Sequence, residues 1–126
     1  MKNPHYQAIG EQEGIRKLVD VFYDKMDSDP EVKVIRDLHD KDLTEAREKL
    51  FEFLVGWMGG PPLYEQKHGH PRLRMRHMPF AIGEKERDQW MLCMRYALDK
   101  SDLPEKTKKD LDQRFYQVAD FMRNTD

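Results

Sequence analysis

The stretch Gly69-His70-Pro71-Arg72-Leu73-Arg74-Met75-Arg76-His77-Met78-Pro79-Phe80 holds three arginines, two histidines and two prolines within twelve residues. Pro71 suits the first turn of a helix, because its φ is already helical and its missing N–H would have no partner there. Pro79 disfavours helical geometry at the residue before it, so the helix should end after about two turns. Leu73 and His77, four residues apart, then lie on one face of this short helix. We therefore expect one apolar side chain and one imidazole to point to the interior.

An inward imidazole beside cations that can hold carboxylates is a donor set that ligates haem iron and binds its propionates. A histidine on an apolar helix face is also commonly a hydrogen-bonded core residue, and Arg72, Arg74 and Arg76 also fit a solvated surface. His68 and His70 form an H-x-H pair that could bind zinc, but no cysteine or third histidine stands at a supporting spacing. The rest of the chain decides among these interpretations.

Composition limits the class of protein. The chain has 126 residues, enough for one domain with a single core. Charged residues make up 37% of it, but the net charge is only −2, which argues against a dedicated nucleic-acid binder. The single cysteine, Cys93, excludes an internal disulfide and fits a reducing cytoplasm. The sequence contains neither an apolar run of about 18 residues nor a signal-peptide core. We expect a cytoplasmic protein without a membrane partner.

Apolar residues recur at helical spacing in four long segments. The first runs from Glu11 to Met26 and ends at Asp27-Ser28-Asp29-Pro30, and the second runs from Leu43 to Trp57 and ends at Gly59-Gly60-Pro61-Pro62. The third follows Gly83, and the fourth follows Pro104. No segment alternates with period two for long enough to suggest a strand, so the sequence predicts an all-α fold.

The shorter segments give weaker signals. We expect a lead-in over residues 1–10, a short helix over residues 31–38, and a loop through Tyr64 and His68. Asp42, with Glu45 three residues later, predicts a capping box at the start of the second long helix.

Four features together resemble the truncated haemoglobins of group II. They are Phe22-Tyr23, the run from Gly59 to Tyr64, the run from His68 to Phe80, and Trp90 within Asp88–Met94. The resemblance spans roughly residues 5 to 122. It implies a single truncated globin domain over residues 1–126: a two-over-two α-helical sandwich around a b-type haem (iron protoporphyrin IX). The helices at 11–27 and 43–58 would form one pair, crossing the pair at 84–100 and 105–124.

The resemblance also implies roles for individual residues. His77 takes the position of the proximal iron ligand, and Tyr23 and Trp90 take those of the residues that hydrogen-bond the bound ligand. His39 would add a third polar group, although it also fits an exposed turn. Ala46 falls where many globins keep a distal histidine, so a path for small ligands should be open there.

The same resemblance implies which residues surround the haem. The expected apolar walls are Leu50, Phe53, Leu54, Met75 and Phe80. The expected propionate partners are Arg76 first, then Lys49, Arg74 and Tyr64.

The implied function is reversible binding of O2 and of other small ligands such as NO, CO or sulfide. A cage rich in hydrogen-bond donors should release O2 slowly, which suits NO dioxygenation or peroxide turnover better than transport, and such turnover needs a separate reductase. Two other classes stay open: a sensor or storage globin without turnover, and a haem-free helical module that holds an anionic partner with the arginines of 72–76. The sequence leaves open whether the protein is a monomer or a homodimer.

Overall fold

The computed structural model describes residues 4–72, 75 and 77–125. Every regular element within these ranges is helical, which confirms the predicted all-α class. The predictions for Leu73, Arg74 and Arg76 fall outside the described residues. The elements are α1 (Pro4–Ile9), α2 (Glu11–Ser28), a 3-10 turn η1 (Pro30–Val32), α3 (Lys33–Asp37), α4 (Thr44–Trp57), α5 (Leu63–His68), α7 (Glu84–Lys100) and α8 (Glu105–Phe121).

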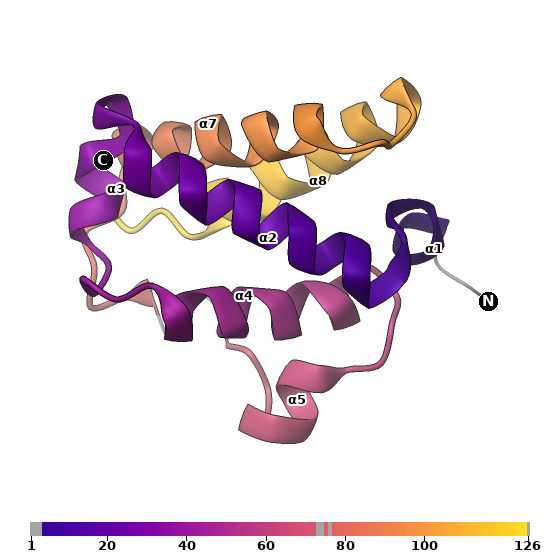
Figure 1. The fold of residues 1–126 in the computed structure, drawn as a ribbon. Helices are drawn as coiled ribbons and strands as arrows, with labels where there is room; N and C mark the ends of the chain where they lie inside the picture. The colour runs from indigo at the N-terminus through magenta and orange to yellow at the C-terminus, as the bar shows by residue number, and fades with distance from the viewer. Residues whose placement is uncertain (1–3, 73–74, 76, 126) are drawn as a thin grey trace.

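Helix α2 lies at the centre of the arrangement (Figure 1). It packs against α4 on one side and across α7 on the other, while α8 packs along α7. The four long helices therefore form two pairs, α2 with α4 and α7 with α8. This is the two-over-two sandwich that the sequence predicted.

The core consists of the apolar stripes of these helices. On α2 the stripe comprises Ile15, Leu18, Val19, Phe22 and Met26, which are at most 2% exposed. Leu54, Val55 and Met58 from the end of α4, Met91 and Met94 from α7, and Leu111 and Phe115 from α8 pack into the same cluster. Helix α2 ends where the sequence predicted, because the Asp29 carboxylate accepts a hydrogen bond from the Glu31 N–H and begins the following 3-10 turn.

The turn after α4 depends on its glycines. Gly59 has a φ of 108°, a left-handed value that glycine adopts without strain. A Cβ on Gly60 would lie 2.5 Å from the Tyr6 ring, so only glycine allows this close approach. The Tyr6 N–H also donates to the Met58 carbonyl. Residues 4–9 are thereby held as helix α1, where the sequence suggested only a lead-in, because a six-residue helix is marginal without tertiary contacts.

Three local predictions are wrong. Leu63–His68 is a helix rather than a loop. The expected capping box does not form: Asp42 accepts from the Thr44 N–H at 2.9 Å, and the Glu45 carboxylate pairs with Lys49 instead. Pro71 does not begin the short helix, because Arg72 has a left-handed φ of 44°.

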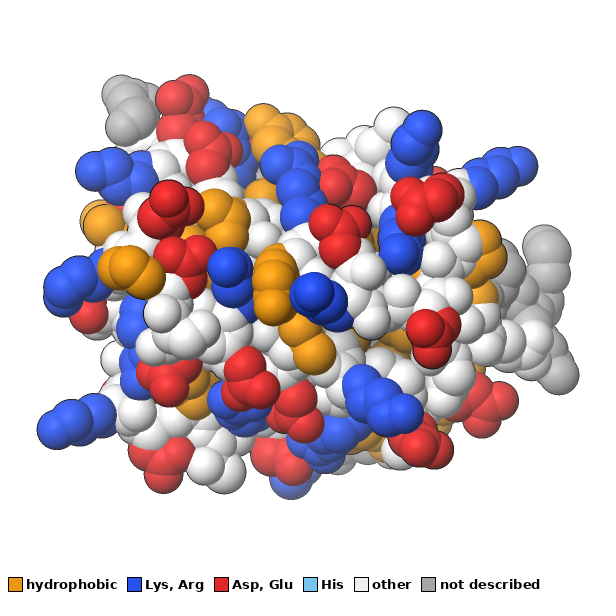
Figure 2. All heavy atoms as spheres, turned by 45° about the horizontal axis from the view of Figure 1, so that its top comes forward, with side chains coloured by type: hydrophobic (Ala, Val, Ile, Leu, Met, Phe, Trp, Pro, Cys, Tyr) orange, Lys and Arg blue, Asp and Glu red, His pale blue; other side chains and the backbone are white. Residues whose placement is uncertain are grey.

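The surface mixes both signs of charge. Figure 2 shows acidic and basic side chains side by side over the face formed by the top of Figure 1, with small apolar areas between them. Many of these groups pair locally, as Lys25 does with Asp29 and Arg95 with Asp112. Within the described ranges, no helix is long and apolar enough to cross a membrane.

Candidate functional site

A cavity of about 520 Å³ lies between α4, α7 and α8. This volume is within the range of about 300–1,000 Å³ that is usual for small-molecule and cofactor sites. Most of its lining is apolar, from Ile35, Leu38, Ala46, Leu50, Phe53, Leu54, Trp57, Phe80, Ile82, Phe115, Val118, Ala119 and Met122. Polar and ionisable side chains enter it at Tyr23, His39, Lys49, Tyr64, His77, Glu86, Arg87 and Trp90.

Helix α4 supplies one wall because it is apolar on two faces. Ala46, Leu50, Phe53 and Trp57 lie at spacings of four, three and four residues and so share one face, which lines the cavity. The neighbouring face carries Leu54, Val55 and Met58 into the protein core. The apolar residues that recur at helical spacing along α4 therefore form a cavity wall as well as a core face.

Two hydrogen-bond donors face the cavity without a partner. Tyr23 is 5% exposed and Trp90 is partly buried, and their rings both contact Phe22. Within the described part of the chain, neither the Tyr23 hydroxyl nor the Trp90 indole N–H meets an acceptor. Burial raises the pKa of Tyr23 well above its ordinary value, although Arg47 opposes this shift, so the phenol keeps its proton. A molecule in the cavity that can accept hydrogen bonds would satisfy both groups.

His39 enters the cavity as a neutral side chain with a defined tautomer. Its Nδ1 lies 2.7 Å from the Ile35 carbonyl oxygen, which can only accept, so Nδ1 carries the proton. Burial lowers the pKa of His39, the Ile35 carbonyl opposes this, and Arg36 and His77 lower it further. The neutral ring leaves Nε2 as an acceptor. The His39 and Tyr23 rings meet edge to face, with their centroids 5.8 Å apart.

His77 lines the cavity from the segment between α5 and α7. It is half-buried and has helical backbone, and the Phe80 N–H donates to its carbonyl at 3.0 Å. The helical backbone does not extend past Pro79, as predicted. The sequence reasoning that placed one inward imidazole here therefore agrees with the position of His77.

Cationic side chains lie at the cavity as well. Lys49 was predicted there, and its ammonium pairs with Glu45 at 2.9 Å. Arg87 was not predicted: its guanidinium holds Asp120 at 2.8 Å and Asp88 at 3.0 Å. No local sequence signal distinguishes this arginine from the many exposed ones, because its position follows from the packing of α7 on α8.

The cavity brings together most of the predicted site residues. These are Tyr23, His39, Lys49, Leu50, Phe53, Leu54, Tyr64, His77, Phe80 and Trp90. Met75 is 57% exposed and is not one of the lining residues. Arg74 and Arg76 lie outside the described residues, so their role stays a prediction.

Helix α5 is held against α4 by a buried carboxylate. Glu52 is 8% exposed and accepts from His68 Nε2 at 3.1 Å and from Lys67 Nζ at 3.2 Å. The His68 ring contacts Tyr64, with centroids 4.7 Å apart, so the same contacts place Tyr64 at the cavity. Burial acts to raise the pKa of Glu52, but the hydrogen bonds from His68 and Lys67 outweigh it and lower the pKa.

His68, at the end of α5, and His70, in the loop after it, thus have different partners. His68 binds Glu52, whereas His70 accepts from the Arg72 N–H at 3.0 Å. In the part of the chain that the structure describes, no three histidine, cysteine or acidic side chains are grouped to hold a metal ion.

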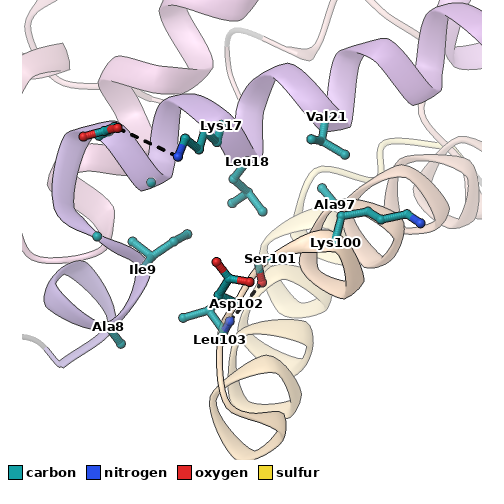
Figure 3. A pocket seen from close by; sticks show the side chains of 13 residues that line it. Ala8, Ile9, Lys17, Leu18, Val21, Ala97, Lys100, Ser101, Asp102 and Leu103 are labelled. Carbon is teal, nitrogen blue, oxygen red and sulfur yellow. Dashed lines mark hydrogen bonds and ion pairs between the residues drawn. The ribbon is translucent and has the colours of Figure 1, made fainter.

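A second cavity, of about 350 Å³, lies where the start of α2 approaches the α7–α8 connection (Figure 3). Apolar Leu18 and Leu103 and exposed Lys17, Lys100 and Asp102 are among its lining residues. It contains none of the predicted site residues, and its charged groups are solvated. The larger cavity is therefore the candidate functional site.

The fold and the site define a globin of the two-over-two class. A family model described as a bacterial-like globin matches residues 4–124, and the chain belongs to that family. Within the family it is a group II truncated haemoglobin, as the sequence motifs predicted. Membership of this family supports haem-based ligand binding.

Individual relatives are similar over nearly the whole chain. A group 2 truncated haemoglobin of Bacillus subtilis is 41% identical over 97% of this chain and 89% of its own length. The structure of a cold-adapted truncated haemoglobin from the Antarctic marine bacterium Pseudoalteromonas haloplanktis is 43% identical, with a TM-score of 0.94 over 96% of this chain and 98% of that one. A structure described as a truncated oxygen-avid haemoglobin from Bacillus subtilis is 42% identical, with a TM-score of 0.84 over 94% and 98% of the two chains.

We predict that Glu52→Gln loosens α5 at neutral pH. Since the folded-state pKa of Glu52 lies below the ordinary value of 4.5, its stabilisation is present above that value and is lost as the pH falls through the folded-state pKa. We expect the free energy of unfolding in urea to fall by about 1–3 kcal/mol at pH 7, the usual worth of a hydrogen bond to a charged group. The difference in the free energy of unfolding between the variant and the wild type should become smaller below pH 4.5. Glu65→Gln, a change of an exposed residue on α5 itself, is the control; an equal loss in both variants would contradict the role of Glu52.

Proposed function

We propose that this protein binds haem b through His77 and uses it to bind O2 and other small ligands such as NO, CO or sulfide. The proposal is supported by the groups that line one apolar cavity. These are the His77 imidazole, the Tyr23 and Trp90 donors without partners, and an acceptor on His39. The apolar walls fit a flat hydrocarbon-rich macrocycle, and the imidazole fits its iron. Bound haem would supply reversible ligation of small molecules and electron exchange.

The chain's own residues then have distinct tasks. His77 would hold the iron, while Lys49 and Tyr64, which line the cavity, would bind carboxylates of the cofactor, together with the predicted Arg74 and Arg76. Leu50, Phe53 and Leu54 would exclude water from its faces. Ala46, at the same wall, leaves space for a small ligand to enter.

Tyr23 and Trp90 would stabilise bound O2 by donating hydrogen bonds to it. In a site shielded from water, such bonds are stronger than in solution. The His39 ring meets the Tyr23 ring edge to face at 5.8 Å and would hold that ring in place, so that its single O–H can donate to O2. All three residues act on the ligand side of the cofactor, and together they should slow O2 release.

We propose redox turnover rather than transport as the physiological use. Slow O2 release favours a protein that consumes O2 in oxidising NO to nitrate, with a separate cytoplasmic reductase returning the electron. The relative described as oxygen-avid is consistent with strong O2 retention. Peroxide turnover is the second candidate, supported by the polar Tyr23, Trp90 and His39 side chains that could polarise an O–O bond. A sensor or storage role would show the same O2 binding without turnover, in a monomer or a homodimer.

Removing His77 tests the proposal directly. We expect wild-type protein supplied with haem to show a strong Soret band that shifts on reduction and again with CO. His77→Ala should lose the haem or bind it with an altered ferrous spectrum, because the imidazole that ligates the iron is gone. The exposed His70 provides the matched control, and His70→Ala should keep the wild-type spectra. A wild type that takes up no haem would reject the proposal and favour the haem-free anion-binding module.

Removing either distal donor should speed O2 release. Each hydrogen bond contributes about 1–1.5 kcal/mol, so Tyr23→Phe and Trp90→Phe should each raise the O2 dissociation rate by about five- to tenfold. Stopped-flow replacement of O2 by CO measures this rate. Tyr96→Phe makes the same chemical change on a tyrosine of α7 that is 37% exposed, and it should have no effect. Unchanged rates in both cavity variants would contradict the hydrogen-bonded cage.

The redox role predicts fast reaction with NO. When the reduced, O2-saturated protein is mixed with NO, we expect stoichiometric nitrate, measured by ion chromatography, within the mixing time. Loss of O2 without nitrate would favour a sensor or storage protein.

A further inference from the structure

The residues that follow α8 contact the segment that carries His77. Asn124 lies three residues beyond the end of α8, 47 residues along the chain from His77. Its side-chain amide nitrogen donates to the Phe80 carbonyl at 2.8 Å and to the His77 carbonyl at 3.3 Å. Its side-chain oxygen accepts from the Ile82 N–H at 2.9 Å.

The backbone of the same residues completes the contact. The N–H groups of Asn124 and Thr125 donate to the Ile82 carbonyl at 2.8 and 3.1 Å. Because Nδ2 meets two carbonyl oxygens and Oδ1 meets an N–H, the orientation of the Asn124 amide is fixed by its partners. A single side chain thus uses both of its donors and its acceptor on residues 77–82.

The carbonyls that Asn124 binds are those that a helix end leaves without partners. The helical backbone at His77 does not extend past Pro79, so the last carbonyls lack the N–H groups of a next turn. The His77 carbonyl receives one local bond, from the Phe80 N–H at 3.0 Å, and Asn124 supplies a second. Asn124 therefore acts as a C-cap donated from a distant part of the sequence.

We propose that Asn124 is a positioning residue for the iron ligand: by fixing the backbone of His77 and Phe80 it sets the height and orientation of the His77 imidazole in the cavity. This inference rests on the proposed role of His77. Phe80 and Ile82 also line the cavity, so the same hydrogen bonds fix two of its apolar walls. Met122, two residues before Asn124, lines it as well, which couples the end of α8 to this segment.

The sharpest variant is Asn124→Asp. It keeps the shape and the oxygen that accepts from Ile82, but it replaces the amide nitrogen by a second oxygen that repels the carbonyls of His77 and Phe80. We expect the Fe–His stretching band of the reduced protein, measured by resonance Raman, to shift or broaden. Haem transfer to an excess of apomyoglobin should become about tenfold faster, since two hydrogen bonds are lost.

Two controls separate positioning from general loosening. Thr125→Ala keeps the backbone hydrogen bond to Ile82 and should behave as wild type. Arg95→Ala breaks the pair with Asp112 that joins α7 to α8, at 2.8 and 3.2 Å, without touching residues 77–82. It should lower stability in urea while leaving the Fe–His band unchanged.

A readout without haem distinguishes the two proposals. In the apo-protein, hydrogen exchange at the Ile82 amide should be about tenfold faster in Asn124→Ala than in the wild type. Equal exchange, or wild-type Raman and haem-transfer results in Asn124→Asp, would overturn the positioning role while His77 remained the ligand. Two results would overturn the proposed function and the positioning role with it. One is a wild-type protein that binds no haem, and the other is a His77→Ala variant that keeps the wild-type Fe–His band.

Discussion

The constraint on which the structure depends is the second apolar face of α4. Leu54 and Val55 pack into the core, but the face with Leu50, Phe53 and Trp57 lines a cavity. Apolar surface exposed to water costs about 25 cal/mol per Å². An apolar group that fills the cavity removes this cost, so the fold and the cofactor stabilise each other. The helix pairs of the sandwich place α4, α7 and α8 around that volume.

Two polar groups at the cavity, Tyr23 and His39, have a defined protonation state. Burial keeps the proton on Tyr23, and the Ile35 carbonyl fixes the proton of His39 on Nδ1. Buried donors without partners are unfavourable in a dry core. Tyr23 and Trp90 line the cavity, where a bound molecule could accept hydrogen bonds from both, as we propose for O2.

The segments that close the cavity are short and depend on polar contacts from elsewhere. Helix α5 has six residues and is held to α4 through Glu52, and the His77 segment is held by Asn124. Helices of this length are marginal by themselves. We therefore expect α5 and residues 77–82 to open more readily than the four long helices.

The sequence alone determined the four long helices and the ends of the first three, because apolar spacing and the Gly-Pro turn at 59–62 act locally. The last helix, expected over 105–124, ends at Phe121. Its motifs also indicated Tyr23, Trp90 and His77 as residues of one site. The structure corrected what depends on distant contacts: α1 and α5 are too short to be predicted from their own residues, and Arg72 prevents a helix from starting at Pro71. The roles of Arg87 and Asn124 were not visible in the sequence. Asp120 lies 33 residues from Arg87, and His77 lies 47 residues from Asn124, so only the packing of α8 beside α7 and the His77 segment decides these contacts.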